Sequence, residues 1–135
     1  MGYPIETIEG IGPAYAKKMR KAGIKSCERL LEWGATPKGR KEIAEATGFD
    51  AKVILKWVNF SDLMRIKGVG EEYSELLEAA GVDTVKELRN RNAKNLADKM
   101  AEVNAKKKLV RSVPSEKRVT GWVDQAKALP PKVTY

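Results

Sequence analysis

Apolar residues recur along the chain at the spacing of an α-helix. Side chains at positions i, i+3 and i+4 of a helix share one face, so a stripe of this period marks a buried helix surface. The clearest stripes are Val53, Ile54, Trp57 and Val58, and the apolar positions between residues 119 and 129. No stretch shows the sustained two-residue alternation that is typical of a strand. The sequence therefore predicts an all-α fold built from short helices.

Capping residues mark the ends of these helices. Pro13 suits the first turn of a helix, because the N–H that it lacks has no partner there. Gly23 and Gly81 are placed as left-handed residues that end the preceding helices. Ser26 and Thr84 can then cap the helices that follow. The glycines and the caps thus occur as pairs, one member in each half of the chain.

The second half of the chain repeats the first at an offset of 58 residues. Residues 8–12 align with residues 66–70, and the match continues without a gap until Leu30 lies over Leu88. A match of this length predicts a duplicated helical unit. Because a solenoid needs at least three repeats, we expect the pair to pack into one domain. That domain would span residues 1–135, with repeat one over 4–60, repeat two over 61–129 and a C-terminal tail over 130–135.

The composition excludes several classes of function. The 135 residues include no histidine and a single cysteine, Cys27. Histidine is the commonest general base and metal ligand, and one cysteine cannot form an internal disulfide or a multi-thiolate metal site. We therefore expect no catalytic residues, no metal and no cofactor, and a binding protein rather than an enzyme.

Hydrophobicity and charge narrow the choice of compartment and partner. No apolar run approaches the roughly 18 residues of a membrane span, and no basic-then-apolar leader begins the chain, so we expect a cytoplasmic protein with no membrane partner. Lysine and arginine number 26 against 18 aspartate and glutamate residues, for a net charge of +8. This excess of positive charge favours a polyanionic partner.

Each repeat carries a Gly-apolar-Gly turn between two helical segments. The turns are Gly10, Ile11 and Gly12, and Gly68, Val69 and Gly70. This pattern resembles the helix-hairpin-helix motif, and its two copies cover nearly the whole chain. The arrangement is also similar to a bacterial family of tandem helix-hairpin-helix proteins that carries a domain-of-unknown-function label.

The resemblance implies binding to double-stranded DNA through its phosphate backbone, without sequence preference. Glycines let another molecule approach the main chain closely, and N–H groups at the start of a helix attract a phosphate oxygen. We expect Gly10, Ile11 and Gly12 to donate such hydrogen bonds. Lys17 and Lys18 follow on the next helix and would add positive charge.

The second turn is a weaker candidate for the same role. Lys67, Gly68 and Gly70 are its expected phosphate contacts. However, Glu71 and Glu72 occupy the first turn of the next helix, where they complement the helix dipole and repel a phosphate. This pattern favours a structural role for the second turn.

A further basic cluster distinguishes the second repeat. It can be a solvated helix face or a surface for a ligand, and no aromatic residue interrupts it, which favours duplex backbone over single strands. Its members are Lys106, Lys107, Lys108, Arg111, Lys117 and Arg118.

Two alternatives to DNA binding remain open in the sequence. In the first, the protein is an interaction or scaffold module that binds a protein partner, and both turns only shape the fold. The second is enzymatic, because the first turn also resembles the hairpin of helix-hairpin-helix DNA glycosylases. Those enzymes follow the hairpin with a catalytic aspartate, whereas the first acidic residue downstream here is Glu28 and the next aspartate is Asp50. We therefore expect no such activity.

Overall fold

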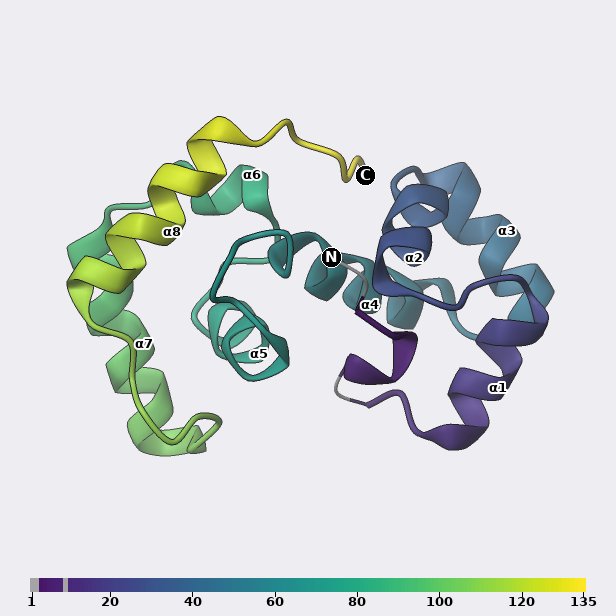
Figure 1. The fold of residues 1–135 in the computed structure, drawn as a ribbon, viewed down its shortest axis with the longest axis horizontal. Coiled ribbons are helices and arrows are strands. Elements are labelled where there is room, and N and C mark those ends of the chain that lie inside the picture. Colours follow the sequence, from purple (N-terminus) through teal and green to yellow (C-terminus); the bar gives the residue numbers. More distant parts are fainter. Residues whose placement is uncertain (1–2, 9) are drawn as a thin grey trace. The chain divides into compact units, whose positions relative to one another are not determined.

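The described part of the chain, residues 3–8 and 10–135 of a computed structural model, is built from helices alone (Figure 1). Over these residues the backbone forms no strand, only an isolated bridge between Pro4 and Ser26. The predicted all-α class is confirmed. The elements are η1 (Ile5–Thr7), α1 (Pro13–Lys21), α2 (Cys27–Gly34), α3 (Pro37–Thr47), α4 (Ala51–Leu63), α5 (Glu71–Ala79), α6 (Val85–Leu88), α7 (Ala93–Lys107) and α8 (Glu116–Ala128).

These elements divide into two compact units. The N-terminal unit comprises Met1–Asp62 together with Lys132–Tyr135, and the C-terminal unit comprises Leu63–Pro131. The predicted junction of the repeats lies between residues 60 and 61, and the boundary between the two units lies after Asp62. No helix within the described residues is long and apolar enough to cross a membrane.

The predicted helix caps are present in both units. Ser26 Oγ accepts a hydrogen bond from Arg29 N at 3.2 Å, and Thr84 Oγ1 accepts one from Glu87 N at 3.3 Å. Such a bond satisfies one of the N–H groups that the first turn of a helix leaves without a partner. The helices therefore begin where the local sequence predicts.

The left-handed glycines are confirmed as well. Gly23 and Gly81, at φ +89° and +95°, follow the last residues of α1 and α5. In the N-terminal unit, Ile24 N donates to Met19 O at 2.9 Å. In the C-terminal unit the equivalent bond, from Val82 N to Leu77 O, is also 2.9 Å. Both helices end in the same way because both turns use the same backbone geometry.

Each unit has its own buried side chains. In the C-terminal unit α7 packs on α5 and α8, and α8 also contacts α6. The core of the C-terminal unit contains Leu63, Ile66, Val69, Leu76, Leu77, Val82, Leu88, Met100, Val119 and Trp122. Buried hydrophobic residues of the N-terminal unit include Ile5, Ile8, Ile11, Met19, Ile24, Leu30, Ile43, Ile54, Trp57 and Val58.

The last residues of the chain belong to the N-terminal unit. Thr134 N donates to Ala35 O at 2.8 Å. Arg40 is only 6% exposed, and its guanidinium donates to Thr134 O at 2.6 Å and to Gly34 O at 2.8 Å. Burial lowers the pKa of the Arg40 guanidinium from its usual value. Two carbonyl groups therefore hold this buried charge beside α2.

Candidate functional site

Two buried isoleucines fix the first Gly-apolar-Gly turn to the core of the N-terminal unit. Ile8 and Ile11 are both buried, and Ile11 N donates to Ile8 O at 3.1 Å. Gly10, between them, adopts φ +93°, a conformation that L side chains rarely adopt. A Cβ at Gly10 would also lie 3.8 Å from Trp57 Nε1. The turn thus holds its apolar residues in the core and leaves Gly10 and Gly12 exposed.

The hydrogen bond of Ile11 changes which donors the turn can offer. The sequence predicts that the amides of Gly10, Ile11 and Gly12 reach a phosphate, but the Ile11 amide already has the Ile8 carbonyl as its acceptor. The amide of Gly10 donates to no other described residue. The donors open to a ligand at this turn are therefore fewer than the sequence predicts.

The start of α1 supplies further open amides. Gly12 is the N-cap of this helix and has no side chain to accept from the first turn, and Pro13 carries no N–H. The amides of Gly12, Ala14 and Tyr15 have no acceptor among the residues that the structure describes. No acidic residue lies in the first turn of α1. No side chain of the first turn therefore offsets the partial positive charge at the N-terminus of α1.

Gly12 is not required by the fold. Its φ of −82° and ψ of −178° are extended angles that any residue can adopt. A Cβ at this position would meet nothing within 4 Å. A glycine at this point leaves the amides at the start of α1 open to close approach by another molecule.

Lys17 and Lys18 are exposed on α1 as expected. Neither forms an ion pair with another described residue. Lys18 Nζ lies 5.7 Å from the centroid of the Phe49 ring, and this ring packs edge-on against Trp57 at 5.5 Å. The Phe49 ring, which packs against Trp57, therefore lies against the ammonium group of Lys18.

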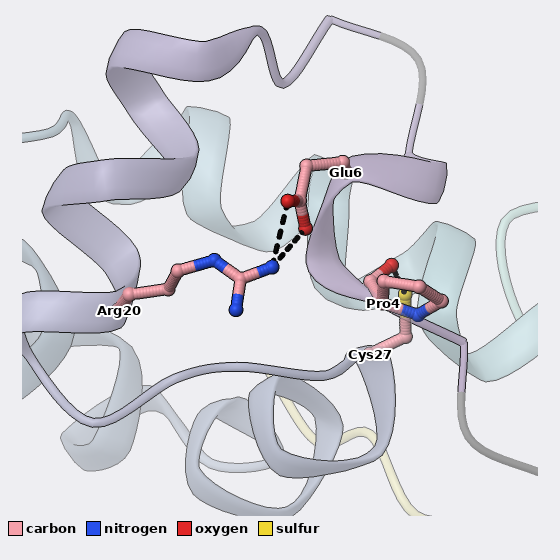
Figure 2. A network of polar contacts seen from close by, with 4 residues as sticks. All are labelled: Pro4, Glu6, Arg20 and Cys27. Carbon is pink, nitrogen blue, oxygen red and sulfur yellow. Dashed lines mark hydrogen bonds and ion pairs between the residues drawn. The ribbon is translucent and has the colours of Figure 1, made fainter.

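Arg20 differs from the lysines, although it lies on the same helix. Its Nη2 atom donates to both carboxylate oxygens of Glu6, each at 2.6 Å (Figure 2). The hydrogen bond from Arg20 lowers the pKa of the Glu6 carboxyl. The segment from Pro13 to Cys27 contains no acidic residue, but η1 brings Glu6 to this helix from outside that segment. The positive charge of Arg20 is therefore largely neutralised.

The second turn has the same backbone construction. Val69 N donates to Ile66 O at 3.1 Å, and Gly68 adopts φ +93°, the same value as Gly10. Gly70 is the N-cap of α5 without a side-chain acceptor, and a Cβ there would again meet nothing within 4 Å. Glu71 and Glu72 are exposed in the first turn of α5. The turns thus differ in charge rather than in shape.

Lys67 in the second turn has a partner that sequence reasoning missed. Its backbone N donates to Gln125 Oε1 at 2.8 Å, and Gln125 Nε2 donates back to Lys67 O at 3.2 Å. Gln125 lies on α8, 58 residues away, and nothing in the local sequence marks it as a partner of the turn. The amide side chain fixes the backbone of Lys67 and leaves its ammonium group exposed.

Cys27 occupies an apolar position. Its side chain is 2% exposed, and Sγ donates to Pro4 O at 3.5 Å (Figure 2). Burial raises the pKa of the thiol to about 12. Among the described residues no group of three or more histidine, cysteine or acidic side chains could hold a metal ion.

The fold and the turns define an all-α protein of two units, each with a Gly-apolar-Gly turn whose apolar residue is buried and whose following helix has no side-chain N-cap. The chain belongs to the family described as Domain of unknown function (DUF4332), whose model matches residues 9–129. No curated protein and no solved structure shows a significant match to the chain.

Proposed function

We propose that this protein binds double-stranded DNA through its phosphate backbone, with no sequence preference, by means of the turn at Gly10. The observation that carries the proposal is the open start of α1. The amides of Gly12, Ala14 and Tyr15 have no acceptor within the described residues, and the glycine that exposes them is not required by the fold. A phosphate oxygen is the natural acceptor for amides at the positive end of a helix.

We also propose that the two units are tandem helix-hairpin-helix repeats. The shared φ of Gly10 and Gly68, and the equivalent bonds from Ile11 to Ile8 and from Val69 to Ile66, support this assignment. Such turns hold the backbone of a duplex and do not read its bases. A cytoplasmic location agrees with a DNA ligand.

The charge distribution favours the first turn over the second as the DNA contact. Lys17 and Lys18 follow the first turn and are not neutralised by any described acidic residue, whereas Glu71 and Glu72 follow the second. The net charge of +8 adds a long-range attraction to any polyanion. Because bound phosphates release counterions, log K should fall with log salt concentration at a slope of about −0.9 per phosphate engaged.

The test is a fluorescence anisotropy titration of a labelled duplex of random sequence at two salt concentrations. We expect binding at low salt that weakens as salt rises and is similar for unrelated sequences. The double variant Lys17→Glu with Lys18→Glu should reduce the affinity strongly. The control, Lys38→Glu with Lys41→Glu, makes the same charge change on exposed residues of α3 in the same unit, and it should cost much less. Absence of binding by the unmodified protein at low salt would refute the proposal.

A protein-interaction role is the second candidate, and the acidic start of α5 favours it. Glu71 and Glu72 make the second turn unsuitable for a phosphate approaching the first turn of that helix. In this case a protein partner recovered from a lysate should be retained after nuclease treatment. The complex should also survive Lys17→Glu with Lys18→Glu.

A further inference from the structure

A second basic surface lies in the C-terminal unit, on the side of the second turn that faces α8. Here a hollow of about 410 Å³ opens beside Gly68. This volume falls in the range of small-ligand sites. No carboxylate is among the described residues that line it, and Glu71, Glu72 and Glu116 all lie outside it. The lining residues are Lys67, Gly68, Ser115, Lys117, Arg118, Gly121, Trp122 and Gln125.

Three positive side chains contribute to the hollow. Lys67, Lys117 and Arg118 are exposed, and none forms an ion pair with another residue that the structure describes. Three positive charges around one hollow favour an anion, because each of them attracts it and none is held in an ion pair with a described carboxylate.

Two of these residues are held in place by their neighbours. Arg118 Cζ lies 4.9 Å from the centroid of the Tyr73 ring and 5.7 Å from that of Trp122, and its Nη1 atom donates to Tyr73 Oη at 3.2 Å. The remaining N–H groups of the guanidinium donate to no other described residue. The pair of hydrogen bonds between Gln125 and Lys67 fixes the rim of the hollow on the opposite side. The Arg118 side chain and the Lys67 backbone therefore lose little conformational freedom when a ligand binds.

The indole of Trp122 gives an independent indication of a ligand. This side chain is 2% exposed and lines the hollow, and its Nε1 atom lies 3.2 Å from the position of a Cβ on Gly68. The indole N–H donates to no other described residue, and it is not one of the fully buried polar atoms that lack a partner, so it is open to the hollow. Gly68 leaves space next to this N–H, and an oxygen of a ligand in the hollow can accept from it.

We propose that this hollow binds a phosphate group. Lys67, Lys117 and Arg118 would neutralise its charge, and the Trp122 indole would donate to one of its oxygens. The phosphate can come from a nucleic-acid backbone or from a small phosphorylated molecule, and the experiment below separates these sources. The site uses none of the amides at Gly12, so it does not depend on the DNA contact proposed for the first turn.

The test follows the indole N–H signals of the protein by ¹H–¹⁵N NMR during a titration with inorganic phosphate, with chloride holding the ionic strength constant. The chain has three tryptophans, and Trp33, whose Nε1 atom donates to Glu42 Oε1 at 3.2 Å, is the internal control. We expect the Trp122 signal to shift in a saturable manner and the Trp33 signal to stay in place. Equal shifts of these two signals, or no shift of the Trp122 signal, would overturn the proposal.

Two charge variants show whether the lysines of the hollow are responsible. Lys67→Gln with Lys117→Gln should weaken phosphate binding at least about tenfold, because two charged contacts are lost. The control, Lys106→Gln with Lys107→Gln, removes the same charge from exposed residues at the end of α7, outside the hollow, and should leave the affinity unchanged. If both double variants weaken phosphate binding equally, net charge alone explains the effect, and the proposed site is refuted.

A parallel titration with duplex DNA identifies the source of the phosphate. A shift of the Trp122 signal by DNA that inorganic phosphate reverses assigns the hollow to the nucleic-acid backbone. A shift by phosphate alone assigns it to a small phosphorylated ligand. Gly12→Ala, which tests the first turn, should leave the phosphate titration unchanged, so that a failure of one proposal is distinguishable from a failure of the other.

Discussion

Replacement of Gly12 by alanine separates the function proposed for the first turn from its role in folding. The extended backbone at this position accepts any residue, and a Cβ would meet nothing within 4 Å. The new methyl group would stand beside the open amides at the start of α1. It would therefore obstruct a ligand that approaches the main chain, while the protein itself would accommodate it without a clash.

Two opposing effects keep the change in stability small. Alanine restricts the unfolded chain more than glycine does, which stabilises the protein by about 0.4–1 kcal/mol where the native angles suit it. Alanine is also a poorer N-cap than glycine, which costs roughly 0.5–1 kcal/mol. Since the two contributions have opposite signs, we expect the free energy of unfolding to change by less than about 1 kcal/mol. Thermal unfolding followed by circular dichroism checks this expectation.

The effect on DNA binding should be larger. Loss of one hydrogen bond from an amide to a charged phosphate costs about 1.5–3 kcal/mol. Each factor of ten in affinity corresponds to about 1.4 kcal/mol, so the loss of one such bond should weaken the affinity for DNA roughly 10- to 100-fold. The assay is the anisotropy titration at low salt, with Gly12→Ala compared directly with the unmodified protein.

Gly70→Ala is the matched control for this experiment. Gly70 has the same cap position, similar extended angles and the same open surroundings, but Glu71 and Glu72 follow it. We expect it to leave the affinity for DNA within about twofold of the unmodified protein. If Gly12→Ala binds DNA as well as the unmodified protein, or if both alanine variants weaken binding equally, the reasoning about the first turn is refuted.

Three further predictions concern the stability and chemistry of the N-terminal unit. Gly39→Ala would place a Cβ 1.8 Å from the Trp33 carbonyl oxygen, so denaturant titration should find it destabilised by about 2–3 kcal/mol; unchanged stability would contradict the packing of α2 on α3. Arg40→Met removes two hydrogen bonds, which should cost about 2–4 kcal/mol and abolish the hydrogen-exchange protection of the Thr134 amide. The thiol of Cys27, with its pKa raised to about 12, should react with a disulfide reagent at pH 8 far more slowly in the folded than in the unfolded protein. The folded state favours the protonated thiol, and the stability that this preference contributes should be lost between about pH 9 and pH 12.

The sequence predicts most of the helix boundaries because their signals are local. A cap such as Ser26 bonds to a backbone amide three residues away, and Gly23 ends α1 through its own backbone angles. The apolar spacing identifies Trp57 and Trp122 as buried residues for the same reason, since both lie on regular helices. These features require no knowledge of how distant segments meet.

The details of the site depend on contacts between distant segments. Glu6 neutralises Arg20 from a short helix outside the basic segment, and Gln125 holds Lys67 from 58 residues away. The turn residue Ile11 matches the expected motif, but its amide is occupied by a carbonyl of the same turn. A motif therefore predicts the shape of the turn, and only the folded chain determines which of its donors are open.

The basic cluster of the second repeat illustrates the same limit. In the sequence, Lys117 and Arg118 belong to a cluster that can be a solvated helix face or a surface for a ligand, and no aromatic residue interrupts it. In the folded unit, the side chain of Arg118 packs against Tyr73 and Trp122, and both basic residues border the hollow beside Gly68. Trp122 lies one turn after Arg118 on α8, within reach of a local pattern, whereas Tyr73 comes from α5 and is brought to Arg118 only by the fold.

The central claim is that open backbone amides at the start of α1 bind phosphate. A ¹H–¹⁵N NMR titration of the full chain with a short duplex tests it most directly, because it observes each amide separately. We expect large, salt-sensitive shifts for the amides of Gly12, Ala14 and Tyr15, and small shifts for the amides at the start of α5. Shifts confined to other segments, with the amides of α1 unchanged at saturating duplex, would contradict it.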